Sequence, residues 1–220
     1  MTPAADAAPR LWFIDDRLLV AEKPAGLLSV PGRGEDKQDC LVARLHRAWP
    51  DALVVHRLDM ATSGLMVFAR DPQTQASLSQ AFAQRQVFKR YSAVVAGSPR
   101  PVEADDEGWS VIALPLIADW PNRPLQKVDA DTGKPSTTRW RLLSHDAAAD
   151  TTRLALEPLT GRTHQLRVHL QAIGHPILGD ALYGGPAAER APRLLLHAQH
   201  LAFAHPATGE PLRFDSPDPF

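Results

Sequence analysis

The sequence predicts an α+β fold whose central sheet is mixed but mostly antiparallel and is flanked by helices and loops. Three observations lead to this prediction. Apolar, β-branched segments of strand length outnumber the segments with helical periodicity. The two kinds of segment do not alternate in the strict strand, helix, strand order of parallel α/β proteins. Several strand-like segments are also separated by short turns, which favours hairpins.

The first half of the chain is predicted to contain a hairpin, two helices and two further strands. Residues 11–23 are mainly apolar around the turn-forming segment 15–17, as in a β-hairpin. Residues 40–49 carry apolar side chains at helical spacing and stop before Pro50, which predicts a short amphipathic helix. Strands are expected at 53–58 and 64–69, on either side of a polar segment. Asp71 and Pro72 provide an N-cap and a first-turn proline for a helix through about Gln84.

The second half is predicted to be mainly β-structure with one helix. A strand is expected at 87–95, and it is followed at 97–135 by an insertion or long functional loop rich in proline, glycine and charge. Residues 137–143 and 153–159 form a second predicted hairpin. A helix is expected over 163–173, with Gly174 at its C-terminal end. A strand at 194–203 and a turn at 207–210 close the predicted fold.

Composition limits the class of protein. The single cysteine, Cys40, excludes an internal disulfide, and there is no apolar run of about 18 residues that could span a membrane. Residues 1–10 lack the features of a signal peptide and are expected to be a disordered lead-in. We therefore expect a cytoplasmic protein with a single domain over residues 11–220.

The charge pattern leaves the partner open. A net charge of −1 argues mildly against nucleic acid, because phosphate binding usually requires a basic excess. Basic residues nevertheless gather at 85–90, 123–141 and 162–167, whereas acidic residues gather at 103–107. A positive face opposite a negative one and an ordinary solvated surface are equally compatible with this pattern.

Several types of site are excluded by spacing. The chain contains neither a phosphate-binding P-loop nor a dinucleotide-binding glycine motif nor a serine-hydrolase elbow. On a predicted helix, His164 and His169 would lie on different faces, and on a predicted strand His197 and His200 would point to opposite sides. No metal site is therefore expected.

One polar segment between two predicted strands has a composition typical of a site. The segment His56-Arg57-Leu58-Asp59-Met60-Ala61-Thr62-Ser63-Gly64-Leu65 places a carboxylate, a guanidinium and two hydroxyls on one loop. From these residues alone, an active site and a turn capped by side-chain to backbone hydrogen bonds are about equally supported.

This segment resembles the signature of the RluA-type pseudouridine synthases. Further blocks resemble that family in the same order: 89–97, 160–167, 173–184 and 193–206, so that the resemblance covers residues 11 to 215. It implies the pseudouridine synthase fold and an RNA-modifying isomerase. Because the reaction involves no external group and no redox step, no cofactor is expected.

The resemblance also implies roles for individual residues. Asp59 would be the nucleophile, held ionised by a salt bridge from Arg167, and Tyr91 would stack on the target uracil. Arg57 would fill the space left by the flipped base. Further substrate contacts are expected from His56, Thr62, Arg162, His164, Gln165 and Leu166. Of these, Arg162, His164 and Gln165 would either support the loop or contact phosphate. The alternatives are a surface charge for Arg167, a phosphate contact for Arg57 and a core position for Tyr91.

Residues 26–33 and 114–124 resemble the dual-specificity members of the family, which modify a 23S rRNA hairpin and the anticodon stem-loop of tRNAs. No N-terminal S4 module is expected. The predicted partners are these RNAs, without DNA or membrane, and the predicted state is a monomer. The segment around Trp120 to Lys127 has a composition suited to RNA loops, although Trp120 could instead pin its own loop.

Three alternatives remain open. The chain could modify another rRNA or tRNA uridine, with the same chemistry. It could be a non-catalytic RNA-binding module on the same fold, although the combination of Asp59, Tyr91 and Arg167 argues against this. A glycoside hydrolase would need a second acid near Asp59, for which Asp180 is the candidate.

Overall fold

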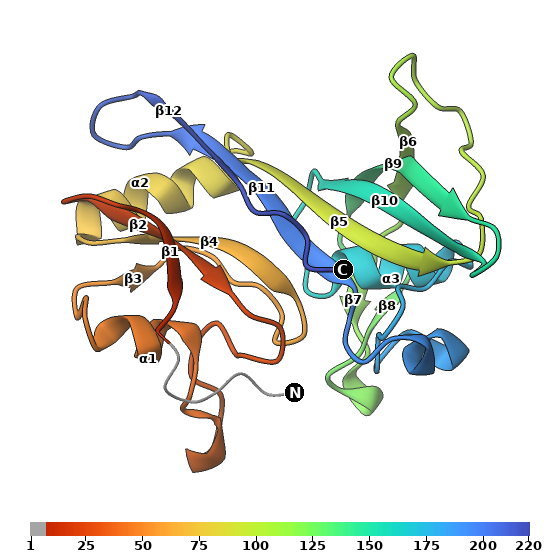
Figure 1. Ribbon diagram of the computed structural model, residues 1–220, viewed down its shortest axis with the longest axis horizontal. Helices are drawn as coiled ribbons and strands as arrows, with labels where there is room; N and C mark the ends of the chain where they lie inside the picture. Colours follow the sequence, from red (N-terminus) through yellow and green to blue (C-terminus); the bar gives the residue numbers. More distant parts are fainter. Residues whose placement is uncertain (1–7) are drawn as a thin grey trace. The chain divides into compact units, whose positions relative to one another are not determined.

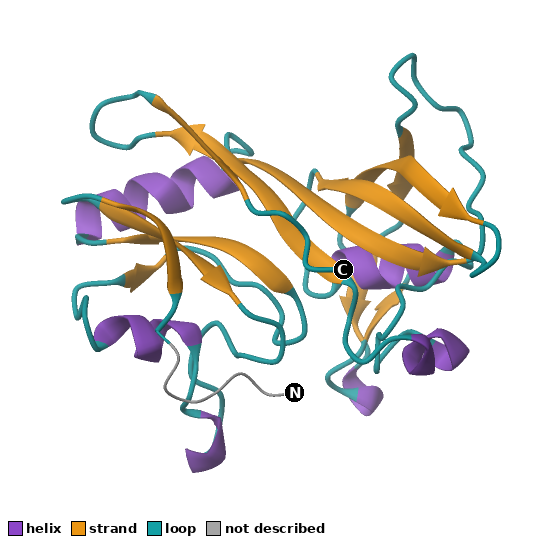
Figure 2. Ribbon diagram, viewed as in Figure 1, coloured by secondary structure: helices purple, strands orange, loops and turns teal. Residues whose placement is uncertain are grey.

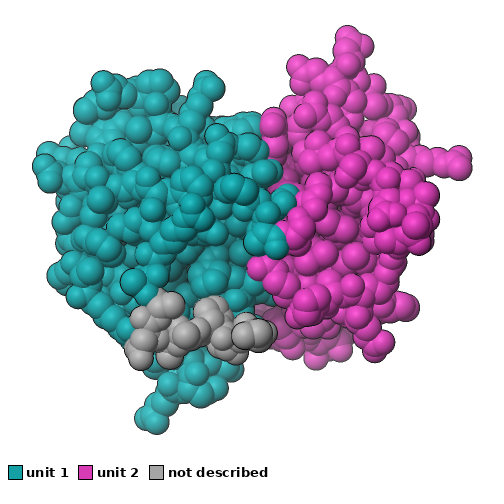
Figure 3. Space-filling model, viewed as in Figure 1, with its two compact units in different colours: residues 1–89, 197–219 teal, residues 90–196, 220 magenta. Residues whose placement is uncertain are grey.

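The computed structural model describes residues 8–220, and the chain divides into two compact units (Figure 3). Unit 1 comprises the described residues up to Lys89 together with His197–Pro219, and unit 2 comprises Arg90–Leu196 with Phe220. Each unit contains β-strands and at least one α-helix (Figure 2). Most of the predicted lead-in, residues 1–7, lies outside the described residues, and the first strand already begins at Arg10.

Unit 1 is built on a mixed sheet (Figure 1). Strands β1 (Arg10–Ile14), β2 (Leu18–Lys23) and β4 (Ser63–Ala69) are antiparallel neighbours. The start of β4 pairs in parallel with β11 (Leu196–Ala204), whose later residues pair with β12 (Pro211–Asp215). The short β3 (Leu53–Val54) pairs with the end of β4. The sheet is therefore mixed and mostly antiparallel, as predicted.

Local sequence explains the elements of unit 1. The carboxylate of Asp15 accepts the N–H groups of Arg17 and Leu18 and so closes the β1–β2 turn. All seven residues of β4 are buried, as expected for a central strand. Asp71 caps α2 (Pro72–Ala83) by accepting the Thr74 N–H at 2.8 Å. The unit also contains η1 (Glu35–Lys37) and α1 (Leu41–His46).

Unit 2 contains a four-stranded antiparallel sheet in the order β5 (Phe88–Ala96), β10 (Thr151–Pro158), β9 (Thr137–Asp146) and β6 (Ser110–Ala113). The first two residues of β5 belong to unit 1. A separate hairpin pairs β7 (Leu116–Ala118) with β8 (Gln126–Val128), and η2 (Trp120–Asn122) connects them. Helix α3 (Gln165–Ala172) and η3 (Gly185–Arg190) complete the unit.

The structure corrects four expectations. The strand expected at 53–58 ends at Val54, because beyond this point a side chain rather than the backbone pairs with β4. The insertion at 97–135 contains three strands, β6, β7 and β8. The turn at 207–210 does not close the fold, because the chain returns along β11 as β12. His164 precedes α3 in a left-handed conformation, with φ 55°, so the helix begins two residues later than predicted.

No helix within residues 8–220 is long and apolar enough to cross a membrane.

Candidate active site

The loop that carries Asp59 is fixed mainly by its backbone. It runs from the end of β3 to the start of β4, and the Thr62 N–H donates to the Asp59 carbonyl at 3.1 Å. The Gly26 N–H donates to the Met60 carbonyl at 2.8 Å. The hydroxyl of Ser29 donates to the Leu58 carbonyl at 2.7 Å and accepts the Leu58 N–H at 3.1 Å. These bonds hold the residues on both sides of Asp59, whose own side chain is half-buried.

Lys23 also holds this loop in place, and it was not predicted from the sequence. Its side chain is fully buried, and Nζ donates to the carbonyls of Pro24 (2.9 Å), Leu27 (2.7 Å) and Met60 (3.0 Å). An ammonium taken out of water is tolerated only where such acceptors surround it. A lysine that ends an apolar strand directly before a proline was the available sequence signal.

The side chain of His56 takes the place of a backbone hydrogen-bond acceptor for β4. Its Nε2 accepts the Val67 N–H at 3.1 Å, and its ring stacks on Phe82 with a centroid distance of 4.5 Å. Burial and the nearby Lys89 cation lower its pKa to about 3, so the imidazole is neutral at physiological pH. In unit 1, His56 therefore anchors the Asp59 loop to β4 and α2, and the substrate contact expected of it stays a prediction.

The remaining predicted residues of this loop differ in exposure. Arg57 is exposed, which leaves its guanidinium accessible to solvent. Thr62 is buried, and so is its neighbour Ser63, whose hydroxyl lies 2.9 Å from Nδ1 of His197. The His197 ring in turn contacts the Ser216 hydroxyl at 3.0 Å. The substrate contact expected of Thr62 stays a prediction.

In unit 2, Arg167 lies on α3 and is buried with only 4% of its side chain exposed. It forms a two-pronged ion pair with Asp180, through Nε at 2.8 Å and Nη2 at 2.6 Å. The same carboxylate accepts the N–H groups of Leu182 and Tyr183. Arg167 is thus not a surface charge. Asp180 is engaged as a buried acceptor, which weakens the glycosidase alternative.

The residues before Arg167 form a hydrogen-bonded network at the N-terminal end of α3. Gln165 is buried, donates to the carbonyl of Thr137 and to the hydroxyl of Thr138, and accepts the Arg162 N–H. Nδ1 of His164 lies 2.7 Å from the Tyr183 hydroxyl. Leu166 is buried, whereas the Arg162 side chain is exposed. Of this group, Arg162 is the residue whose charge faces solvent.

Tyr91 is half-buried on β5, opposite Leu156 of β10. Asp59 belongs to unit 1, whereas Tyr91 and Arg167 belong to unit 2. The structure therefore groups the predicted residues into two sets, and the salt bridge expected between Arg167 and Asp59 stays a prediction.

Comparison with known proteins identifies the family. The profile described as RNA pseudouridylate synthase matches residues 17–172. The chain belongs to the RNA pseudouridylate synthase family. It is 49% identical over 96% of its length to the dual-specificity RNA pseudouridine synthase RluA of Escherichia coli K12, covering 93% of that protein. It is also 49% identical to the protein of the same name from Vibrio vulnificus, over 93% of this chain and 81% of that one.

Solved structures of proteins named for a pseudouridylate synthase domain share the fold of this chain. Human RNA pseudouridylate synthase domain containing 1 has a TM-score of 0.79 and 29% identity, over 100% of this chain and 87% of that one. Human RNA pseudouridylate synthase domain containing 4 shares the fold, with a TM-score of 0.72 and 24% identity over 95% of this chain and 88% of that chain. The predictions of the family, the fold class and an RNA-modifying isomerase are confirmed.

The basic clusters of this synthase are partly neutralised within unit 2. Arg90 and Arg139 both bind Glu157, and Arg139 also binds Asp105 at 2.9 Å. The guanidinium carbons of Arg90, Arg139 and Arg141 lie within 5.3 Å of the Trp109 ring centroid. Asp105 of the acidic 103–107 segment thus lies against Arg139 of the basic group.

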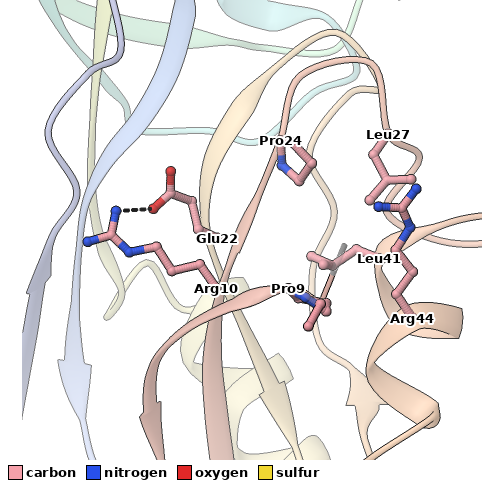
Figure 4. Close-up of a pocket in the computed structure, with 8 residues that line it drawn as sticks. Pro9, Arg10, Glu22, Pro24, Leu27, Leu41 and Arg44 are labelled. Carbon is pink, nitrogen blue, oxygen red and sulfur yellow. Dashed lines mark ion pairs between the residues drawn. The ribbon is translucent and has the colours of Figure 1, made fainter. Parts of the chain in front are cut away.

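A cavity of about 210 Å³ in unit 1 involves none of the predicted site residues (Figure 4). Its charged groups already have partners: Arg10 lies 3.6 Å from Glu22, and Arg44 binds Asp39 through two hydrogen bonds. The rest of its wall is mainly apolar: Ala8, Pro9, Pro24, Leu27 and Leu41. This cavity is a feature of how the N-terminal hairpin packs near α1. Within residues 8–220, no three potential metal ligands gather at one point.

Proposed function

We propose that this synthase isomerises uridine to pseudouridine in two RNAs, a 23S rRNA hairpin and the anticodon stem-loop of tRNAs. The observation that carries the proposal is the 49% identity to the E. coli dual-specificity enzyme over 96% of this chain. The relationship spans both compact units, so the parts that would recognise RNA are included in it.

The reaction needs a nucleophile rather than a cofactor. The N1 to C1′ glycosidic bond breaks, the uracil turns, and C5 bonds to C1′. The proton lost from C5 is balanced by the proton gained at N1. We assign the nucleophile to Asp59, on the loop that Lys23 and Ser29 hold. The carboxylate could attack C1′ or the base or assist a glycal route, and each route requires its ionised form.

Three further residues would handle the flipped nucleotide. Extrusion of a base from a folded loop costs a few kcal/mol of lost stacking, so a group must fill the gap. Arg57 is exposed and two residues from Asp59, which suits insertion into the RNA. Tyr91 would stack on the uracil and assist removal of the C5 proton. Arg167 would pair with Asp59, with Asp180 orienting its guanidinium.

The other predicted contacts divide by exposure. Arg162 is exposed and would bind phosphate. His56, His164, Gln165 and Leu166 would act on the RNA indirectly, by positioning the Asp59 loop and the start of α3. Thr62, buried beside Asp59, would do the same for the turn.

We propose that both units work as one catalytic domain and as a monomer. The family profile supports a single domain, because its match runs from Arg17 in unit 1 to Ala172 in unit 2. A cytoplasmic location follows from the proposed ribosomal and transfer RNA substrates.

The test incubates unmodified tRNA and 23S rRNA with the wild type, Asp59→Ala and Asp16→Ala, and then maps pseudouridine by carbodiimide-blocked primer extension. Asp16 is an exposed aspartate of the β1–β2 turn and serves as the control. We expect modification of both RNAs by the wild type and Asp16→Ala, and none by Asp59→Ala. Modification of one RNA class alone would refute dual specificity. Binding of RNA without modification would favour a non-catalytic module, and activity in Asp59→Ala would remove the assigned nucleophile.

A further inference from the structure

Trp120 is exposed to an extent unusual for a tryptophan. Its residue is 66% exposed, whereas Trp109 and Trp140 in the same unit are 3% and 4% exposed. The Arg123 guanidinium carbon lies 3.0 Å from the Trp120 ring centroid, so one face of the ring is covered by a cation. With this exposure, Trp120 does not pin its loop to the core.

The loop that presents Trp120 is closed by its own hydrogen bonds. The Asn122 N–H donates to the Asp119 carbonyl at 3.0 Å, and the Asp119 N–H donates to the Leu125 carbonyl at 2.9 Å. The Asn122 side chain also donates to the Asp119 carboxylate. Figure 1 shows this turn, η2, beyond the ends of β7 and β8. An exposed ring on such a closed turn loses little conformational freedom when it binds a ligand.

The same loop is tied to the residues around Arg167. The Gln126 N–H donates to the Tyr183 hydroxyl at 2.8 Å, and that hydroxyl contacts Nδ1 of His164 at 2.7 Å. The guanidinium carbon of Arg167 lies 5.0 Å from the Tyr183 ring. Tyr183 therefore connects the Trp120 turn with the start of α3, within unit 2.

We propose that Trp120, backed by Arg123, is a stacking platform for an unpaired base of the substrate RNA, distinct from the flipped target base. The proposal rests on the proposed function and adds a binding residue to it. Unpaired loop bases expose their π-faces, whereas bases inside a duplex do not, so an exposed aromatic ring selects loop nucleotides. The same unit carries exposed positive charge of the sign that the RNA backbone requires, at Arg162 before α3 and at Lys127 on β8, which lies 3.9 Å from Asp129.

The platform contributes binding energy rather than chemistry, because every base has a face that can stack. Removal of the ring should therefore weaken RNA binding and leave the rate at saturating RNA unchanged. One base and one aromatic ring account for about a 5- to 150-fold change in affinity.

The test uses the full chain and a tRNA anticodon stem-loop, with filter binding for Kd and single-turnover kinetics for the rate. The variants are Trp120→Ala, Trp120→Phe and the control Val111→Ala, which shortens another exposed apolar side chain (56%), on β6. We expect Kd to rise about 5- to 150-fold for Trp120→Ala, to change little for Trp120→Phe, and to stay at the wild-type value for Val111→Ala.

An abasic scan of the RNA loop separates stacking from a structural effect. Removal of the base that stacks on Trp120 should weaken RNA binding by the wild type. The same abasic position should leave the Kd of Trp120→Ala unchanged, because that variant has no ring on which the base could stack. Equal Kd values for Trp120→Ala and wild type would overturn the proposal. It would also be overturned if every abasic substitution changed Kd by the same factor in Trp120→Ala as in the wild type. A wild type that binds the stem-loop without modifying it would overturn the proposed function alone, because the binding comparison does not depend on turnover.

Discussion

The buried pair Arg167 and Asp180 allows a quantitative test of the structure. We consider Asp180→Asn, which preserves the shape of the side chain. The amide oxygen can still accept the N–H groups of Leu182 and Tyr183, which the carboxylate accepts at 3.0 and 3.1 Å. The amide nitrogen, however, would face the Arg167 Nε–H, now 2.8 Å from a carboxylate oxygen, and would place two donors together.

The expected cost follows from the burial of both partners, whose side chains are 4% and 0% exposed. Removal of one charge from a buried ion pair costs about 3–5 kcal/mol, because the remaining guanidinium stays buried and loses this carboxylate. For a chain of this size, each kcal/mol lowers the melting temperature by about 2–4 °C. We therefore expect Asp180→Asn to melt about 6–20 °C below the wild type.

The assay is thermal denaturation followed by circular dichroism, with Asp146→Asn as the matched control. Asp146 also accepts two backbone N–H groups, from Ala148 and Ala149, but it is exposed. Its substitution should change stability by less than about 0.5 kcal/mol. Arg167→Met and the double variant Asp180→Asn/Arg167→Met complete a double-mutant cycle. The double variant should lose less unfolding free energy than the sum of the losses of the two single variants. A melting temperature within 2 °C of wild type for Asp180→Asn would refute this reasoning.

Two further predictions concern the loop that carries Asp59 and the start of β4, which follows it. Gly64→Ala should cost more than about 2 kcal/mol, because φ is +122° and the new Cβ would lie 2.3 Å from the Ala198 carbonyl oxygen. Gly161→Ala, with no atom within 4 Å of its Cβ, is the control, and equal urea midpoints for the two variants would contradict the prediction. His56→Gln should make stability less sensitive to acid, since the folded-state pKa of about 3 lies below the ordinary 6.5 and the unfolded chain binds the proton first. Between pH 7 and pH 5 the free energy of unfolding of the wild type should fall by up to about 2 kcal/mol more than that of the variant. The same pH dependence of the free energy of unfolding in both proteins, measured with urea, would disprove this.

Sequence reasoning succeeded where neighbouring residues decide the structure. The β1–β2 turn is closed by Asp15 through N–H groups two and three residues away, and Asp71 caps α2 through Thr74. The motif around Asp59 was likewise readable because its residues are contiguous. Such features depend on short-range hydrogen bonds and on backbone preferences, both of which the local sequence contains.

The roles of several site residues could not be read in this way. The substrate contacts expected of His56 and Gln165 stay predictions, but the structure adds internal partners: His56 pairs with Val67 of β4, and Gln165 binds Thr137 and Thr138 of β9. These partners lie 11 to 28 residues away in sequence. Only the pairing of strands brings such groups together, and a polar side chain has the same composition whether it faces RNA or a backbone carbonyl.

By itself, therefore, the sequence determined the fold class, the family resemblance and the identity of Asp59 as the candidate nucleophile. The tertiary structure decided which polar groups are buried and which partners they have. Lys23 donates to the Met60 carbonyl of the Asp59 loop, and Asp180 accepts from Arg167. The structure also showed that Trp120 is exposed. The physical reason is that burial and long-range pairing set the environment of a charge or a ring, and environment is a property of the folded chain rather than of its local sequence.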